Sequence, residues 1–313
     1  MLALRKGLVE RGVLGINRRN ADYVSAWNSR RLFPLVDDKL ETKRLALEAG
    51  MAVPELYGVI AEQHEVVELP RLLDGRQDFV LKPAHGSGGN GILVIAGRRG
   101  KRFRKVSGEL IEPEELYHHT SSTLSGLYSL GGHRDRVMME YRVRLDPLFE
   151  QITYKGVPDL RTIVFRGYPV MAMARLPTRA SDGKANLHQG AVGVGIDLAT
   201  GRTLGGVLGN EKIGEHPDTD HELTGIQIPG WQELLELAAR CYEITGLGYL
   251  GVDVVLDREH GPMILELNAR PGLNIQIANR RGLRDRLQRV GIAEAAGEDP
   301  AMRVAKARAW FAS

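Results

Sequence analysis

Three side chains that suit a divalent cation lie in the C-terminal part of the sequence. Asp253 is part of "YLGVDVVL", and Glu266 and Asn268 belong to "MILELN". The six residues between these stretches, "DREHGP", favour a turn, so the two stretches are predicted to form an antiparallel hairpin. If Leu256 pairs with Met263, the two carboxylates lie side by side. The carboxamide then shares their face, because side chains alternate along a strand.

This trio has the chemistry of a metal–phosphate site. Two adjacent carboxylates repel each other, which raises one pKa unless a cation intervenes. Mg²⁺ prefers such hard oxygen ligands and completes its shell with substrate phosphates. The alternative is that the carboxylates pair with arginines, and Arg270 is close in sequence. The hairpin alone leaves both interpretations open.

A glycine-rich loop in "VLKPAHGSGGNGILVI" has the spacing Gly86-x-Gly88-x-x-Gly91. A dinucleotide-binding turn would need a helix directly after the loop, whereas the apolar, β-branched run over 92–95 predicts a strand. Strand–loop–strand favours a flap whose backbone N–H groups wrap phosphate oxygens, with Lys82 supplying a point charge. The alternative is a flexible hairpin with Lys82 extended to solvent. The chain lacks the full H-R-D-L-x-x-x-N catalytic loop and the D-F-G element of a protein kinase,.

Alternating strands and helices must position these groups. Capping residues and periodicity predict helices over 40–49, 113–119 and 231–246 and a basic helical region at the end. Strands are predicted over 56–60, 78–82, 91–96, 136–143, 161–175, 191–208, 249–256 and 263–268. The sequence therefore predicts a mixed α+β protein.

Composition narrows the class of protein. The chain has 313 residues, of which 43% are hydrophobic and 26% charged, and its net charge is +3, which is typical of a soluble globular protein. No run approaches the ~20 apolar residues of a membrane helix. The single cysteine, Cys241, favours a reducing, cytoplasmic setting,. Basic residues gather between Arg5 and Arg31, either as a patch for nucleic acid or an acidic partner, or as a solvated arm, and no nucleic-acid module supports the former.

Taken in order, these features resemble the ATP-grasp superfamily, and most closely its RimK-type α-L-glutamate ligases. The resemblance runs from "DDKLETKRLALEAGMAVP" to "NARPG". It implies an α+β ATP-grasp fold with two α+β subdomains that clamp ATP, and with the usual N-terminal domain absent or truncated. The implied parts are a basic arm over 1–36, a small subdomain with the flap over 37–140, a C-terminal subdomain with the Mg²⁺ site over 141–290, and a helical tail over 291–313.

The resemblance also implies roles for individual residues, through motifs such as "DDK", "VMMEYRV", "PDLR" and "KANLHQGA". The implied ATP-binding residues are Lys39, Lys82, His85, Gly86, Ser87, Gly88, Gly89, Gly91, Glu140, Asp159, Lys184 and Asn186. The implied catalytic residues are Lys82, Arg161 and Arg270, and the implied substrate-binding residues are Arg175, His188 and Gly272. The implied metal ligands are Asp253, Glu266 and Asn268.

Several of these residues have a simpler alternative. Lys39 would be an ordinary solvated helix charge, and Arg175 would be structural. Glu140 would be an exposed strand residue, with Glu150 as its competitor. His188 would only bond within its own loop.

The implied activity is ATP-dependent joining of a carboxylate to an amine through an acyl phosphate, with Mg²⁺ or Mn²⁺. An amino acid such as glutamate would be added to a peptide or small-molecule acceptor. The alternatives are an ATP-grasp phosphotransferase and a nucleotide-binding module without turnover. No membrane partner is expected, and nucleic acid is disfavoured. A second copy or a partner protein would complete the acceptor site if the N-terminal domain is absent.

Overall fold

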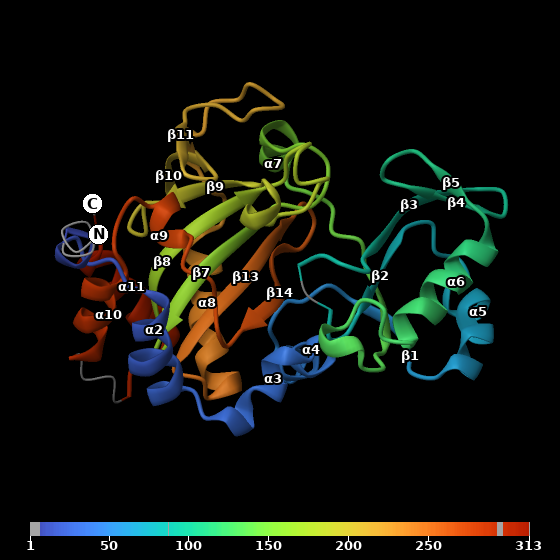
Figure 1. Ribbon diagram of the computed structural model, residues 1–313, viewed down its shortest axis with the longest axis horizontal. Helices are drawn as coiled ribbons and strands as arrows, with labels where there is room; N and C mark the ends of the chain where they lie inside the picture. Colours follow the sequence, from blue (N-terminus) through green and yellow to red (C-terminus); the bar gives the residue numbers. More distant parts are fainter. Residues whose placement is uncertain (1–6, 87, 293–296, 313) are drawn as a thin grey trace. The chain divides into compact units, whose positions relative to one another are not determined.

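The computed structural model describes residues 7–86, 88–292 and 297–312 (Figure 1). These residues form two compact units. The larger unit comprises the described residues of Met1–Asp37, Glu41–Ala52 and Leu145–Ser313, and the smaller unit comprises those of Asp38–Leu40 and Val53–Arg144. Both units combine helices with antiparallel sheets, which agrees with the predicted α+β class. No helix in the described part of the chain is long and apolar enough to cross a bilayer.

The smaller unit contains a six-stranded antiparallel sheet with the strand order β1-β6-β2-β3-β4-β5. The strands are β1 (Leu56–Ile60), β2 (Phe79–Pro83), β3 (Leu93–Arg99), β4 (Arg102–Lys105), β5 (Leu110–Ile111) and β6 (Val137–Glu140). The strand β3 follows the glycine-rich loop and pairs with β2. The predicted strand–loop–strand arrangement is therefore confirmed.

Two helices and two 3-10 segments accompany the sheet in the described part of this unit. They are α5 (Leu69–Leu72), α6 (Pro113–Leu124) and the 3-10 helices Gln63–Glu68 and Leu130–Gly132. Glu112 and Glu115 form a capping box at the start of α6, which satisfies backbone N–H groups that the helix cannot pair internally,. Leu116 of α6 joins Phe79 and Ile95 of the sheet in one buried core. The core thus fixes the two strands that flank the glycine-rich loop.

The larger unit contains an antiparallel sheet with the order β11-β10-β9-β8-β7-β13-β14, and β12 pairs with β10. The strands are β7 (Asp159–Phe165), β8 (Tyr168–Leu176), β9 (Val192–Ile196), β10 (Arg202–Leu208), β11 (Glu211–Ile213), β12 (Thr224–Gln227), β13 (Tyr249–Asp257) and β14 (Gly261–Asn268). The helices after residue 145 are α7 (Pro147–Ile152), α8 (Trp231–Thr245), α9 (Ile275–Ala278), α10 (Arg284–Gly291) and α11 (Pro300–Trp310).

Two helices, α8 and α9, pack against this sheet. The helix α8 packs on β7, β8, β13 and β14 (Figure 1), and its buried side includes Leu234, Leu235 and Cys241. Burial raises the pKa of the Cys241 thiol, so this cysteine is a core residue rather than a nucleophile. The helix α9 approaches β9 at Gly195, where a Cβ atom would lie 2.5 Å from the carbonyl oxygen of Ala278. Glycine at this position permits the close approach.

The described part of the N-terminal segment, residues 7–36, is folded rather than a solvated arm; Arg5 and Lys6 of the basic cluster lie outside the described residues. It forms α2 (Ile16–Arg18), a π-helical segment Arg19–Ser25, a 3-10 helix Arg30–Leu32 and α3 (Pro34–Asp37), followed by α4 (Lys39–Glu48). Tyr23 and Val24 are buried, and Asn28 bonds to the sheet. The Asn28 Nδ2 donates to the carbonyl oxygens of Tyr249 and Ala269 at 2.8 and 3.0 Å, and its Oδ1 accepts from the Tyr249 N–H at 2.9 Å. The expectation of an arm failed because these contacts join residues that lie far apart in sequence.

The hairpin of β13 and β14 has the predicted pairing only near its open end. Asp253 lies opposite Glu266, as predicted, but Leu256 lies opposite Pro262 rather than Met263. The register shifts after Asp253 because β14 contains one extra residue there, a β-bulge at Leu265,. The predicted alternation is therefore correct for the polar residues and wrong nearer the turn.

Candidate functional site

A cluster of charged and amide side chains lies across four neighbouring strands of the larger unit. In the order of the sheet, β8, β7, β13 and β14 bring these residues together, because Asp159 pairs with Arg175, Arg161 with Asp253, and Asp253 with Glu266. Residues two apart on one strand share a face. The polar cluster consists of Asp159, Arg161, Arg175, Asp253, Glu266 and Asn268.

Two arginines hold the carboxylates at the centre of the polar cluster. The Arg161 Nε and Nη2 donate to the two carboxylate oxygens of Asp253 at 2.6 and 2.5 Å. The Arg175 Nη2 donates to Asp253 Oδ2 at 2.8 Å, and both Arg175 donors contact Asp159, with Nε–Oδ1 at 2.5 Å. Asp253 is only 2% exposed and Asp159 only 5%. The alternative of arginine pairing is therefore correct for Asp253, although the partners are not Arg270.

The same contacts set the protonation of these groups. Burial disfavours the charged form of Asp253, but Arg161 and Arg175 outweigh it and lower the pKa of that carboxyl,. Burial raises the pKa of Asp159 to about 6, against the attraction of Arg175. Burial opposes the charge of Arg175 as well, but Asp159 and Asp253 raise its pKa above the ordinary value. Asp253 is thus the fixed anion of the polar cluster.

This behaviour of Asp159 predicts a pH effect on stability. Its folded-state pKa of about 6 lies above the ordinary 3.8, so between these values the native state keeps a proton that the unfolded chain has lost. The contribution of Asp159 to the unfolding free energy should therefore fall as pH rises from about 4 to about 6. Urea unfolding of the wild type and of Asp159→Asn across this range should show their difference falling with pH. A difference that rises with pH would contradict the raised pKa.

The third carboxylate of the polar cluster is in a different position. Glu266 is half-buried, and its side chain forms no hydrogen bond or ion pair within the described ranges 7–86, 88–292 and 297–312. The Asn268 Nδ2 lies 3.4 Å from Asp253 Oδ2, so the carboxamide belongs to the same group. Three carboxylates and two guanidinium groups leave one uncompensated negative charge.

The donor set fits a hard divalent cation. The residues that the structure describes contain no group of three His, Cys, Asp or Glu side chains suited to a metal. A third protein ligand would therefore be an amide oxygen, and Asn268 supplies one. Mg²⁺ commonly takes one or two carboxylates and completes its shell with water and phosphate oxygens. Glu266 and Asn268 would hold such an ion beside Asp253.

In the smaller unit, the predicted nucleotide lysine and hinge glutamate form a buried ion pair. The Lys82 Nζ of β2 lies 2.5 Å from Glu140 Oε1 of β6, and these side chains are only 5% and 3% exposed. The alternatives that place Lys82 in solvent and Glu140 on an exposed strand are therefore wrong. Glu150, the competitor of Glu140, is exposed and pairs with Arg258 at 2.8 Å in the larger unit.

Because this pair is buried, removal of one partner should be costly. Lys82→Met removes the lysine that pairs with the buried Glu140 carboxylate and is expected to lower the unfolding free energy by about 3 kcal/mol,. The double variant Lys82→Met/Glu140→Gln should recover more than half of that loss, as measured by urea denaturation. Lys105→Met is the matched control, because it breaks the exposed Lys105–Glu109 pair of the same unit and should cost less than ~1 kcal/mol. Equal losses from Lys82→Met and Lys105→Met would contradict the buried pair.

Contacts at its base hold the glycine-rich loop. The Lys39 Nζ donates to the Gly86 carbonyl oxygen. The His85 backbone N–H donates to both Asp135 oxygens at 3.1 Å, and the ring Nδ1 is 2.9 Å from Asp135 Oδ1. Although burial opposes it, hydrogen bonds from Ser129 and His85 lower the pKa of Asp135. Asp135 was not identified from the sequence, because only the folded chain brings it to the loop.

The glycines of the loop are required by its backbone conformation. Gly88, Gly89 and Gly91 have φ values of 65°, 79° and 75°, a region that other residues rarely adopt. A Cβ atom on Gly91 would also lie 2.6 Å from the ring of Tyr128. Ser87 lies outside the described residues. Because glycine has no side chain, the backbone at these three positions is unobstructed, as a phosphate flap requires.

Four other predicted residues lie outside the polar cluster. Lys184 is half-buried, and Asn186 caps a 3-10 turn by accepting from the His188 N–H at 3.0 Å. His188 is exposed, and Gly272 is exposed directly after β14. No hydrogen bond or ion pair links these residues to the polar cluster within the described part of the chain. Their functional roles stay predictions.

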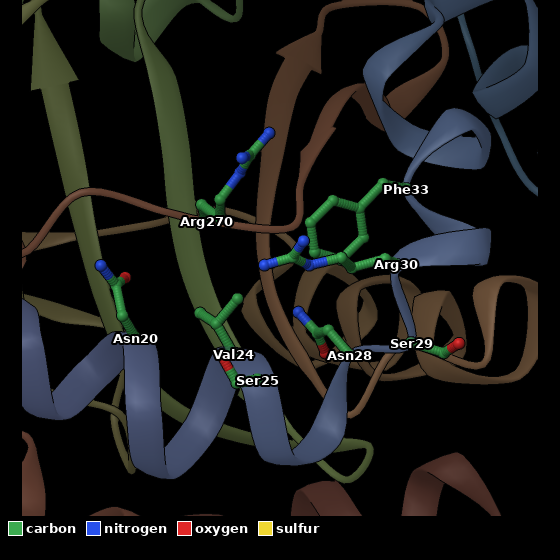
Figure 2. Close-up of a pocket in the computed structure, with 8 residues that line it drawn as sticks. All are labelled: Asn20, Val24, Ser25, Asn28, Ser29, Arg30, Phe33 and Arg270. Carbon is green, nitrogen blue, oxygen red and sulfur yellow. The ribbon is translucent and has the colours of Figure 1, made fainter.

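Arg270 lies at a pocket that sequence reasoning missed. The pocket has a volume of about 660 Å³ and is formed by the N-terminal segment together with Arg270, all within the larger unit (Figure 2). Its lining residues are Asn20, Val24, Ser25, Asn28, Ser29, Arg30, Phe33 and Arg270. The basic cluster at the start of the chain was the only signal in the sequence, and it gave no indication of a concave surface.

The sequence matches one family model and several curated relatives. Residues 18–292 match the family model described as sugar-transfer associated ATP-grasp. A probable alpha-L-glutamate ligase from Maridesulfovibrio salexigens is 24% identical over 238 residues, and another from Pseudomonas putida strain GB-1 is 22% identical over 236 residues. Each alignment covers 75% of this chain and 56% of the relative, so the chain spans little more than half the length of these relatives. Among solved structures, D-cycloserine synthetase DcsG is 17% identical, with a TM-score of 0.45, and the match covers 90% of this chain and 71% of that chain.

Proposed function

Because the chain belongs to the sugar-transfer associated ATP-grasp family, we propose that it is an ATP-dependent carboxylate–amine ligase. The observation that carries this proposal is the polar cluster of the larger unit. It places a buried, fixed anion, two paired arginines and an unpaired carboxylate on one face of the sheet. Such a charge pattern suits a metal-bound polyphosphate rather than an apolar ligand.

The smaller unit supplies nucleotide-binding groups in this proposal. Lys39 and Lys82 contribute positive charge, and backbone N–H groups of the loop over 85–91 contact phosphate oxygens. Glu140 serves as the hinge acid, and its buried ion pair with Lys82 fixes the position of both side chains. Asp159 and the loop residues Lys184 and Asn186 complete the proposed ATP-binding set.

The larger unit supplies the charge that the reaction needs. Arg161 and Arg175 stabilise the negative charge that develops during phosphoryl transfer. Mg²⁺ or Mn²⁺, held by Glu266 and Asn268 beside Asp253, would neutralise phosphate charge when bound. Arg270 and Gly272 would contact the carboxylate substrate, and His188 would contact the amine-bearing one.

The proposed reaction has two steps. A carboxylate oxygen of the acid attacks the γ-phosphorus of ATP, which forms an acyl phosphate and releases ADP. The amine then attacks the acyl carbon, loses a proton to solvent, and expels inorganic phosphate as the amide forms. No side-chain nucleophile is required, which agrees with the burial of Cys241. Since the curated relatives are called glutamate ligases, an amino acid such as glutamate is the first amine substrate to test, with a peptide or small-molecule acceptor.

ADP release from the purified chain across a panel of amino acids and carboxylic acids tests this function. The expected result is release that requires both an acid and an amine, with an amide product identified by mass spectrometry. A stable phosphorylated product formed without an amine would replace the ligase with a phosphotransferase. Tight ATP binding without ADP release for any pair would instead indicate a nucleotide-binding module.

A further inference from the structure

The pocket beside Arg270 has an excess of positive charge. Arg30 is exposed at its rim, and its side chain has no hydrogen bond or ion pair within residues 7–86, 88–292 and 297–312. Arg270 is 58% exposed, stacks on Phe33 at 5.1 Å, and has its nearest carboxylate, Asp37, at 3.8 Å. In the view of Figure 2, the Arg30 guanidinium lies below that of Arg270. Arg30 has no counter-ion among the described residues and Arg270 has only the long contact with Asp37, so these two guanidinium groups favour an anionic ligand,.

A third arginine adds to this charge from within the protein. Arg19 is only 6% exposed, and its Nη1 donates to the Pro271 carbonyl oxygen at 2.7 Å. Its buried Nε has no hydrogen-bond partner among the residues that the structure describes. Burial first, and then the charge of Arg270, lower the pKa of Arg19. A bound anion would relieve the repulsion between these guanidinium groups.

The remaining lining residues are neutral. Asn28 is buried and uses its amide groups on the backbone of Tyr249 and Ala269, so it forms a fixed floor with Val24. The side chains of Asn20, Ser25 and Ser29 are on exposed residues and supply hydroxyl and amide groups. None of the described residues that line the pocket is Asp or Glu. The lining would therefore offer no carboxylate to a ligand's ammonium group, whereas it would offer hydrogen-bond partners to hydroxyl or amide groups.

We propose that this pocket binds a small carboxylic acid with a neutral, hydrogen-bonding body, and that Arg30 and Arg270 hold its carboxylate. The volume of about 660 Å³ lies within the usual range for small-molecule sites, roughly 300–1,000 Å³. The binding of such an acid does not depend on the proposed function. The further statement that ATP activates this carboxylate rests on the proposed function, and in that case Arg30 selects the acid substrate.

Binding to the full chain without nucleotide tests the pocket directly. The probe is N-acetyl-dialanine, a carboxylate with an amide body, and its Kd is measured by NMR titration at low ionic strength. Two comparison compounds are used. The C-terminal amide of N-acetyl-dialanine lacks the carboxylate charge, and trialanine keeps the carboxylate but adds an ammonium group. The expected order of affinity is N-acetyl-dialanine above trialanine, with the amide weakest.

Two variants localise the effect. Arg30→Gln should raise the Kd of N-acetyl-dialanine by about 10-fold or more, because a charge-assisted hydrogen bond is lost. Arg31→Gln is the matched control, since Arg31 is an adjacent exposed arginine that does not line the pocket, and it should leave the Kd unchanged. Neither variant touches the core, so thermal unfolding should stay unchanged in both.

Several results would overturn the proposal. These are no binding of the probe, equal effects of Arg30→Gln and Arg31→Gln, equal affinity for trialanine, or equally tight binding of inorganic phosphate. If the probe binds but ADP release does not depend on an amine, the pocket proposal holds and the proposed ligase activity is wrong. If the chain has ligase activity but does not bind the probe, the pocket proposal is wrong and the proposed ligase activity holds.

Discussion

Replacement of Glu266 by glutamine is expected to lower ATP turnover by about 10³-fold, a loss of ~4 kcal/mol in transition-state stabilisation. Glu266 is half-buried, and its side chain has no hydrogen bond or ion pair in the described ranges. Its carboxylate is therefore available to a cation, and the amide cannot replace its charge. For the same reason the fold does not depend on it, so the unfolding free energy should change by less than ~0.5 kcal/mol.

Steady-state ADP release at saturating Mg²⁺, together with urea unfolding, measures both quantities. Glu211→Gln is a matched control, because Glu211 is an exposed glutamate on β11 of the same sheet, and its turnover should match the wild type. Unchanged turnover in Glu266→Gln would remove this residue from the metal site.

Asp253→Asn should lose both stability and turnover. The carboxylate is 2% exposed and accepts hydrogen bonds from Arg161 and Arg175. An amide keeps the shape but leaves two largely buried guanidinium groups without their common anion, which is expected to cost about 3–5 kcal/mol. This variant alone therefore cannot separate a metal ligand from a structural anion, which the Glu266 variant can.

The stability loss is measured by urea unfolding of the full chain. Asp285→Asn, at an exposed position on α10, should change the unfolding free energy by less than ~0.5 kcal/mol. Adding Arg161→Met to Asp253→Asn should restore part of the stability, because one unpaired charge is removed. A wild-type unfolding midpoint in Asp253→Asn would contradict the ion-paired arrangement.

Local patterns predicted the parts of the fold that depend on local chemistry. The ATP-grasp resemblance is confirmed by the family match over residues 18–292. The strand after the glycine-rich loop followed from β-branched residues, and the pairing of Asp253 with Glu266 followed from a short turn and alternation. The bulge at Leu265 could not be predicted, because it depends on how both faces of β14 pack.

Long-range partners also escaped prediction. Arg161 and Arg175 reach Asp253 only because β7 pairs with both β8 and β13. Lys82 meets Glu140 because β2 pairs with a strand more than fifty residues away. Neither strand order is encoded in a short motif. The resemblance implied a ligand-binding role for each of these residues, but it did not indicate that they pair with one another.

Asn28 connects the floor of the pocket to the hairpin that carries the polar cluster. Its amide bonds to backbone groups at the start of β13 and directly after β14. Substitutions at the exposed rim residues Asn20 and Arg30 can therefore alter ligand binding without disturbing the fold, whereas any change at position 28 would disturb both the pocket and the hairpin. Divergence in substrate preference among family members should accordingly accumulate at the rim and spare the floor.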